Sequence, residues 1–317
     1  MEAEDAADAP RSRLGRAFSW LLASSSFSNL ADGIVKVALP LLAARQTDDP
    51  MLIAAVAAAL SLPWLVFALP AGVMADRLDR RLIMLVANFA RGAGFGTLAI
   101  ASIAGAPPIV VLLGIALVIG IAEVCYDTVA QSLLPAIVDR PLLTRANGRL
   151  QAAETVTNQF LGQPIAGFLM GASVVLATAV PAALWFVAVA CLLGMRGSFT
   201  PDGAGPGRRG IVREIGDGLR YLFFNPLLRV LAVLVGGFNL ASSAVFSVFV
   251  LFAVGSDAPM GLDERGYGLL LTAIALGSLL GALLAERLQR LVGRARLLVV
   301  AIPVGSCLFL APALTSQ

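Results

Sequence analysis

Six ionisable side chains lie inside long apolar stretches of the sequence, where a charge is costly and therefore marks a candidate functional site. They are Asp32, Lys36, Arg91, Glu123, Asp127 and Glu154. The chain contains no histidine, which excludes Ser/His and Cys/His nucleophile pairs and histidine-ligated metals. We find neither metal-ligand spacing nor a phosphate-binding glycine loop. The sequence therefore predicts no enzyme, no metal site and no bound cofactor.

The polar residues within these stretches recur at helical spacing, so each set shares one face of a helix. The sets are Asn29, Asp32 and Lys36; Glu123, Asp127 and Gln131; Gln151, Glu154 and Asn158; and Asn239, Ser243 and Ser247. Four helices with one polar face each predict a shared wet cavity. An alternative stays open, in which the charges form ion pairs that hold the helices together. Those pairs would be Asp32–Lys36 and Arg91–Glu123.

The composition places these residues in membrane helices. The chain is 58% hydrophobic and 14% charged, with a mean hydropathy of +0.87, whereas a soluble domain carries about 25% charged residues. About 20 apolar residues cross the hydrocarbon layer as a helix. The sequence contains nine such runs, at roughly 17–44, 51–75, 82–104, 107–133, 146–171, 174–195, 226–254, 266–285 and 295–314. It therefore predicts an all-α membrane protein.

Arginine placement predicts the orientation, because loops on the cytoplasmic side carry an excess of arginine and lysine. With a cytoplasmic N-terminus, Arg45 and Arg265 are the two arginines that fall in outer loops. The arginine- and alanine-rich composition indicates a bacterial plasma (inner) membrane. A polar stretch with an amphipathic surface helix separates two groups of runs. The predicted parts are a cytoplasmic tail (1–16), a six-helix bundle (17–195), a linker (196–225) and a three-helix part of a second bundle (226–317).

The second group of runs repeats the first. Shifting the numbering by 210 places Asn29-Leu30-Ala31 on Asn239-Leu240-Ala241. The same shift places the segment 75–80, Ala-Asp-Arg-Leu-Asp-Arg, on 285–290, Ala-Glu-Arg-Leu-Gln-Arg. Two parallel six-helix repeats are the plan of one large transporter class. On this plan we expect twelve helices, with about three of them following Gln317.

A resemblance rests on the loop after the second run, Gly72-Val-Met-Ala-Asp-Arg-Leu-Asp-Arg-Arg. It resembles the signature loop of the major facilitator superfamily, Gly-x-x-x-Asp-Arg-x-Gly-Arg-Arg/Lys. The matching residues are Gly72, Asp76, Arg77, Arg80 and Arg81, and the departure is Asp79, where the family has glycine. The run Leu30-Ala31-Asp32-Gly33 resembles the first helix of the branch that exports enterobactin and macrolides.

The resemblance implies that this loop latches the cytoplasmic gate by pairing with an acidic residue at the inner end of the fourth span. Asp127 is placed for that pairing. Independently of the family, a glycine at position 72 would let two helices approach closely. A competing interpretation is that the loop charges only fix the topology.

A second resemblance lies in the fifth run, Asn158-x-x-x-Gly162-Gln163-Pro164-Ile-Ala-Gly167. It is similar to the antiporter motif Gly-x-x-x-Gly-Pro-x-x-Gly and departs from it at Asn158 and Gln163. Its small residues would permit close helix packing, and Pro164 would bend the helix by removing a backbone hydrogen bond.

Together these resemblances imply a proton-coupled exporter of small molecules such as drugs, siderophores or metabolites, working by alternating access. Proton coupling needs a carboxylate that titrates near physiological pH, and we expect Asp32 or Glu123 to carry the proton. The proton gradient replaces a cofactor, and the partners are a small-molecule substrate and the lipid bilayer, with no nucleic acid. We expect a monomer. The alternatives are an uptake transporter of a metabolite, or an inactive fragment or membrane sensor.

Overall fold

The elements of the described chain are helices. The computed structural model describes residues 14–105, 107–197, 199–200, 211–254, 258, 260–263, 266–274 and 276–277. The helices before the linker are α1 (Gly15–Ala44), α2 (Pro50–Ala75), α3 (Arg80–Ala104), α4 (Ile109–Ile137), the short η2 (Arg140–Leu142), α5 (Leu143–Glu154), the π-helix η3 (Thr155–Gly162), α6 (Gln163–Ala172) and α7 (Val174–Leu193). After the linker follow α8 (Ile211–Phe224), α9 (Pro226–Ala253) and helical residues within 266–277.

Five of these helices are long and apolar enough to cross a membrane, namely α1, α2, α3, α4 and α7. The predicted fifth run, 146–171, falls on α5, η3 and α6, which follow one another without a break. The helical prediction is thus confirmed for the runs up to 226–254. The run 295–314 and the residues 275 and 278–285 of the run 266–285 lie outside the described residues.

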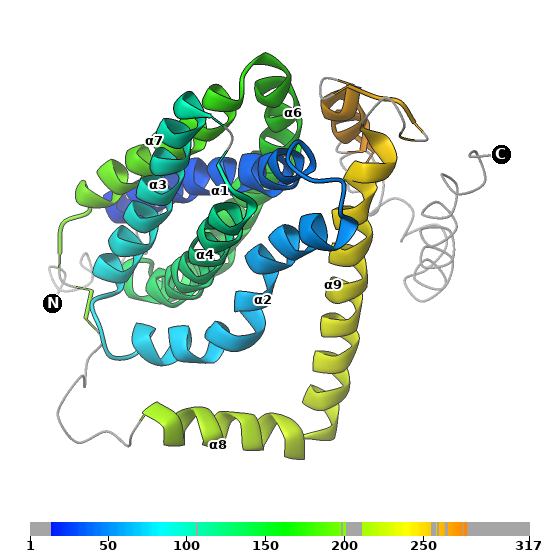
Figure 1. The fold of residues 1–317 in the computed structure, drawn as a ribbon. Coiled ribbons are helices and arrows are strands. Elements are labelled where there is room, and N and C mark those ends of the chain that lie inside the picture. Colours follow the sequence, from blue (N-terminus) through cyan, green and yellow to red (C-terminus); the bar gives the residue numbers. More distant parts are fainter. Residues whose placement is uncertain are drawn as a thin grey trace, which may run out of the picture.

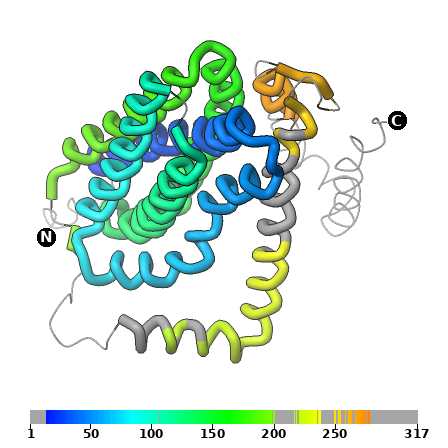
Figure 2. The backbone as a smooth tube through the Cα atoms, viewed as in Figure 1, coloured from blue at the N-terminus to red at the C-terminus, as the bar shows by residue number. Residues whose placement is uncertain are grey.

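Helices α1 to α7 form one bundle, and α8 and α9 extend from it (Figure 1). Helix α8 contacts both α2 and α9, as an amphipathic helix after the linker would. The chain then turns sharply into α9, which packs against α2 (Figure 2). Asn225 makes this turn, because its side chain accepts a hydrogen bond from the N–H of Leu228 (3.2 Å) and Pro226 follows as the first helical residue.

The bundle contains two apolar clusters with a polar layer between them. On α1 the first cluster holds Leu14, Phe18 and Leu21, and the second begins at Ala31. The buried residues between them on α1 are polar: Ser24, Ser25, Ser28 and Asn29. The same alternation occurs on α3, where Asn88 and Arg91 lie between the two clusters. A buried polar layer at mid-helix has to satisfy its own hydrogen bonds, because lipid supplies none.

The predicted fifth run carries the π-helical segment η3, which ends two residues before Pro164. Proline has no N–H, so the carbonyl of Phe160 loses its α-helical donor, and a wider turn accommodates the missing bond. Gly162 ends this segment against α1: a Cβ added there would lie 2.8 Å from the Cα of Gly33 and 3.0 Å from the carbonyl oxygen of Leu30. The predicted close packing at this motif is therefore confirmed.

The close approach of two helices that Gly72 would permit is not seen within the described part of the chain, and the packing role of this glycine stays a prediction. A Cβ added at Gly72 meets no described atom within 4 Å. The residue lies in the last turn of α2, where no described helix approaches it within 4 Å.

Replacing Gly162 by alanine tests the contact between η3 and α1. We expect Gly162→Ala to lower the free energy of unfolding by about 1–3 kcal/mol, because its methyl group meets backbone atoms that cannot move independently. Thermal unfolding of the purified protein in detergent measures this change. The matched control is Gly96→Ala, since a Cβ at Gly96 meets nothing within 4 Å. Equal melting temperatures for both variants would contradict the packing account.

Candidate functional site

A buried ion pair joins α1 to α3 within the polar layer. Nη1 of Arg91 donates to both carboxylate oxygens of Asp32, at 2.8 and 3.0 Å. Its Nη2 donates to the Ser28 hydroxyl at 2.9 Å and to the Asn88 side-chain oxygen. The side chains of Arg91 and Asp32 are 0% and 3% exposed, so solvent screens neither charge.

Two aromatic rings complete the surroundings of the Arg91 guanidinium. Its central carbon lies 5.0 Å from the ring centre of Tyr126 and 5.4 Å from that of Trp185. Cations are stabilised over such ring faces, more strongly away from water. The Tyr126 hydroxyl is itself hydrogen-bonded to Ser24 at 3.0 Å, which fixes the ring. The guanidinium is therefore held by α1, α3, α4 and α7 together.

A second ion pair joins α1 to α4 and is more open. The Lys36 ammonium lies 3.2 Å from a carboxylate oxygen of Glu123, and the two side chains are 42% and 9% exposed. The pairs that the sequence suggested were Asp32–Lys36 and Arg91–Glu123. In the structure the partners are exchanged, so that Asp32 pairs with Arg91 and Lys36 pairs with Glu123. Residues four apart on a helix differ in direction by about 40°. On α1 this offset directs Asp32 toward α3 and Lys36 toward α4.

The Lys36–Glu123 pair lies in the wall of a cavity of about 250 Å³. Its lining residues are Ser25, Asn29, Lys36, Trp64, Glu123, Asp127, Ala130, Gln131, Leu150, Glu154 and Asn158. The structure thus brings together the polar faces that helical spacing predicted on α1, on α4 and on the segment formed by α5 and η3. Asp32 and Arg91 are not among the described residues that line it.

The cavity carries more negative than positive charge among its described lining residues. Glu123, Asp127 and Glu154 oppose the single ammonium of Lys36. Glu154 is 3.4 Å from the amide nitrogen of Gln151, and the side chains of Asn158 and Asn29 meet at 3.5 Å across the cavity wall. Such a site suits a cation or a proton better than an anion.

Asp127 occupies a different place from the one the signature loop implies. It lies in the cavity wall between Glu123 and Gln131, well before α4 ends at Ile137. The fourth helix extends past the predicted end of its apolar run, so the residue is deeper in the bundle than the sequence suggested.

The signature loop itself binds helix ends of the first bundle. Arg81 donates to the carbonyl oxygens of Leu192 (2.8 Å) and Leu193 (2.9 Å) at the end of α7. Arg80 donates to the Ala75 carbonyl at the end of α2 (3.1 Å). Last-turn carbonyls lack the regular donor four residues on, and the arginines donate to them; the Leu192 carbonyl also accepts from the N–H of Met195 (3.1 Å). Asp76 caps the end of α2, and its N–H donates to the Gly72 carbonyl; Arg77 follows it.

Asp79, the departure from the family pattern, has a structural role. Its carboxylate accepts from the N–H of Leu82 (3.0 Å), which caps the start of α3, and from the N–H of Phe199 (3.3 Å) beyond α7. An aspartate in place of the usual glycine therefore ties the loop to α3 and to the segment after α7. The role of the loop in gating stays a prediction.

The remaining predicted residues are Gly167 on α6 and Asn239 on α9. Gly167 packs against Gly268: a Cβ added at Gly268 would lie 3.2 Å from the Gly167 Cα and 3.2 Å from the Pro164 carbonyl oxygen. Asn239 lies on α9, but its side chain is outside the described residues.

Sequence analysis missed the aromatic members of the site. Trp64 lines the cavity from α2, and Tyr126 and Trp185 flank the buried guanidinium. In apolar runs such residues read as ordinary membrane-helix side chains. The one available signal was that Tyr126 directly precedes Asp127 within a polar stripe.

Comparisons with known proteins agree with this architecture. Over 308 residues the chain is 26% identical to the multidrug efflux pump Tap of Mycolicibacterium fortuitum, covering 89% of this chain and 69% of that protein. Over 244 residues it is 29% identical to the enterobactin exporter EntS of Citrobacter koseri, covering 75% of this chain and 55% of that protein. The chain thus spans little more than half of the length of EntS.

Among solved structures, the fold matches the crystal structure of the POT family transporter PepTSo. The TM-score is 0.52 at 14% sequence identity, over 83% of this chain and 52% of that one. The family model described as transmembrane secretion effector matches residues 9–317. The chain is therefore a multi-pass membrane protein that belongs to the transmembrane secretion effector family of the major facilitator superfamily.

Proposed function

We propose that this protein is a proton-coupled exporter that exchanges protons for small organic molecules by alternating access. The distant relatives named as a multidrug pump and an enterobactin exporter support the outward direction. In this proposal the chain lies in a bacterial inner membrane as a monomer, with its N-terminus in the cytoplasm.

One observation carries the proposal: a carboxylate paired with a lysine in the wall of a polar cavity inside the membrane bundle. Glu123 and Lys36 hold each other 3.2 Å apart at the border of that cavity. Proton binding to Glu123 would remove the negative partner and free Lys36. A cationic or polar substrate that contacts Glu123 competes with that proton. Such competition for one group is what exchange of a proton for a substrate requires.

The two ion pairs then have different tasks. Asp32 accepts both of its short hydrogen bonds from Arg91, away from the cavity lining. That pair fixes α1 against α3. We therefore assign proton transfer to Glu123 and a positioning role to Asp32. Asp127 and Glu154 add negative charge to the same cavity.

The signature loop supports rigid-body movement of the first half. By binding the ends of α2 and α7, Arg80 and Arg81 connect helices that would otherwise shift separately. The glycine contact between Gly167 and Gly268 lies where the halves meet and lets their backbones approach. Rocking at this contact would open the cavity to alternate sides.

Transport in everted membrane vesicles tests the function. Vesicles containing the protein are energised to an acidic interior, and a panel of antibiotics together with enterobactin is added singly while a pH-sensitive dye is followed. We expect at least one compound to dissipate the pH gradient and to accumulate inside, with both effects abolished by an uncoupler. Accumulation that is insensitive to the uncoupler, or substrate movement only in the opposite direction, would contradict proton-driven export.

Replacing Glu123 by glutamine tests the proton assignment. Glutamine keeps the shape of the side chain but cannot release a proton, so we expect proton-coupled transport to fall to background while the amount of folded protein stays unchanged. The measurement is the vesicle assay together with quantification of the protein in the membrane. Asp139→Asn is the control, since Asp139 is exposed beyond the end of α4. Full activity of Glu123→Gln would show that another group carries the proton.

Replacing Asp32 by asparagine tests the positioning role. The change leaves the Arg91 charge buried without its counter-ion, so we expect the free energy of unfolding to fall by about 3–5 kcal/mol. The double variant Asp32→Asn/Arg91→Gln removes both charges and should recover a large part of that loss. Thermal unfolding in detergent compares the two. A single variant as stable as the native protein would mean that the pair does not hold the bundle.

A further inference from the structure

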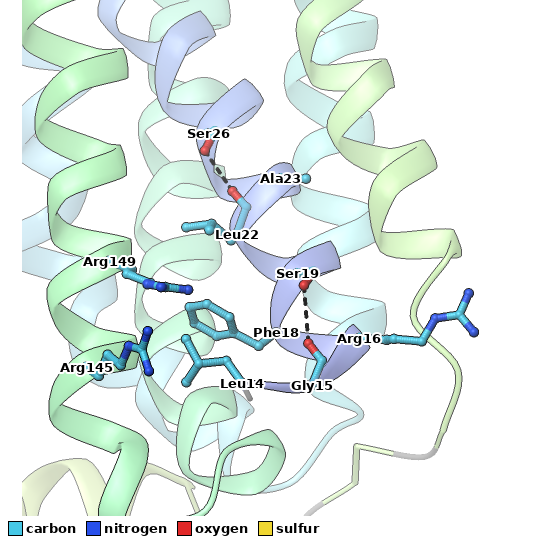
Figure 3. A pocket seen from close by; sticks show the side chains of 10 residues that line it. All are labelled: Leu14, Gly15, Arg16, Phe18, Ser19, Leu22, Ala23, Ser26, Arg145 and Arg149. Atoms are coloured by element: carbon cyan, nitrogen blue, oxygen red, sulfur yellow. Dashed lines mark hydrogen bonds between the residues drawn. The ribbon is translucent and has the colours of Figure 1, made fainter. Parts of the chain in front are cut away.

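A second, larger cavity of about 630 Å³ lies at the start of α1, next to α5 (Figure 3). Its floor includes Leu14, which precedes α1, and Phe18 and Leu22 of α1, and two arginines of α5, Arg145 and Arg149, close one side. This cavity shares no lining residue with the central one. It therefore needs an explanation separate from transport through the bundle.

The arginines around this cavity have no protein counter-ion in the described part of the chain. Arg145 and Arg149 stand one turn apart on α5, and both direct their guanidinium groups toward Phe18 and Leu14 (Figure 3). Arg16 stands at the opposite rim and points away from them (Figure 3). Within the described residues none of the three forms a hydrogen bond or an ion pair. Guanidinium groups facing a hollow without a partner favour an anion there.

The start of α1 adds to the positive potential. Leu14 precedes the helix and supplies no side-chain cap, and the first turn holds no acidic residue. Among the described residues no side chain caps the first N–H groups of the helix, and the positive end of the helix dipole lies at the cavity.

The rest of the cavity is apolar. Phe18 and Leu14 are buried beneath the arginines. The hydroxyl groups of Ser19 and Ser26 donate to carbonyls of their own helix, those of Gly15 (3.2 Å) and Leu22 (2.8 Å), so they offer little further polarity. Along the same helix Trp20 is 38% exposed, an amphipathic ring of the kind that gathers at membrane interfaces.

We propose that this cavity binds the anionic headgroup of a membrane phospholipid, with the beginning of an acyl chain on the Phe18–Leu22 floor. A small anion would satisfy the arginines and leave the apolar floor in water. A lipid satisfies both, and it is already present beside every membrane helix. In the proposed orientation the cavity faces the inner leaflet, whose anionic lipids attract such basic clusters.

This site has a structural consequence. The lipid would join α1 to α5, the two segments that also contribute Lys36 and Glu154 to the central cavity. Its headgroup would thereby hold the wall of the transport site without contacting the substrate.

Lipid binding to the purified full chain tests the proposal. The protein in neutral detergent is titrated with phosphatidylglycerol, with phosphatidylcholine or with inorganic phosphate, and bound lipid is counted by native mass spectrometry alongside the melting temperature. We expect selective binding of phosphatidylglycerol, about 30-fold weaker in Arg145→Gln/Arg149→Gln because two basic contacts are lost. Arg145→Lys/Arg149→Lys keeps the charge and should keep most of the binding. Arg140→Gln/Arg229→Gln removes two exposed arginines outside the cavity and should bind like the native protein.

Three results would overturn the proposal. Equal binding by the glutamine variant and the native protein would show that these arginines do not hold the lipid. Inorganic phosphate that binds as tightly as the lipid would indicate a soluble anion. Lipid binding that arises only after Glu2, Glu4, Asp5 and Asp8 are neutralised would make the acidic N-terminal stretch the occupant.

Discussion

The fold depends on the contacts that stabilise one buried charge, the guanidinium of Arg91, inside a bundle of membrane helices. Arg91 is fully buried, and a charge in that position is costly unless it is compensated on every side. Asp32 supplies the counter-charge, Ser28 and Asn88 accept hydrogen bonds from Nη2 of Arg91, and the rings of Tyr126 and Trp185 lie against the guanidinium, whereas its buried Nε has no hydrogen-bond partner among the described residues. Because these partners come from α1, α3, α4 and α7, satisfying one charge fixes the relative positions of four helices.

Because the contacts of Arg91 fix these helices, the neighbouring pair Lys36–Glu123 can remain more exposed. Because Asp32 is paired with Arg91, Glu123 pairs with Lys36 at the border of the cavity, where the lysine side chain is 42% exposed. The buried pair Asp32–Arg91 thus stabilises the fold. The more exposed pair Lys36–Glu123, one helical turn along α1, is the one that we assign to proton exchange. The π-helical turn of η3 and Gly162 bring the segment from α5 to α6 against α1, which places Asn158 and Glu154 on the remaining side of the cavity.

Periodicity alone predicted most of the cavity wall, because side chains three, four or seven residues apart share a helix face. The ion-pair partners could not be predicted in this way. Which carboxylate meets Arg91 depends on how α1 and α3 are rotated against each other, and that rotation results from packing between helices distant in sequence. The aromatic members were missed for a related reason: Trp185 is one apolar residue among many until α7 is placed against α3. Gly72 shows the converse, since a small residue permits a close approach without requiring one.

The central claim is that substrate and proton compete for Glu123. The most direct test is proton release by the purified protein in weakly buffered detergent, when a compound transported in the vesicle assay is added and a pH indicator is read. The account predicts that binding releases protons from the native protein and releases none from Glu123→Gln, although the variant still binds the compound. Equal proton release by both proteins would contradict it.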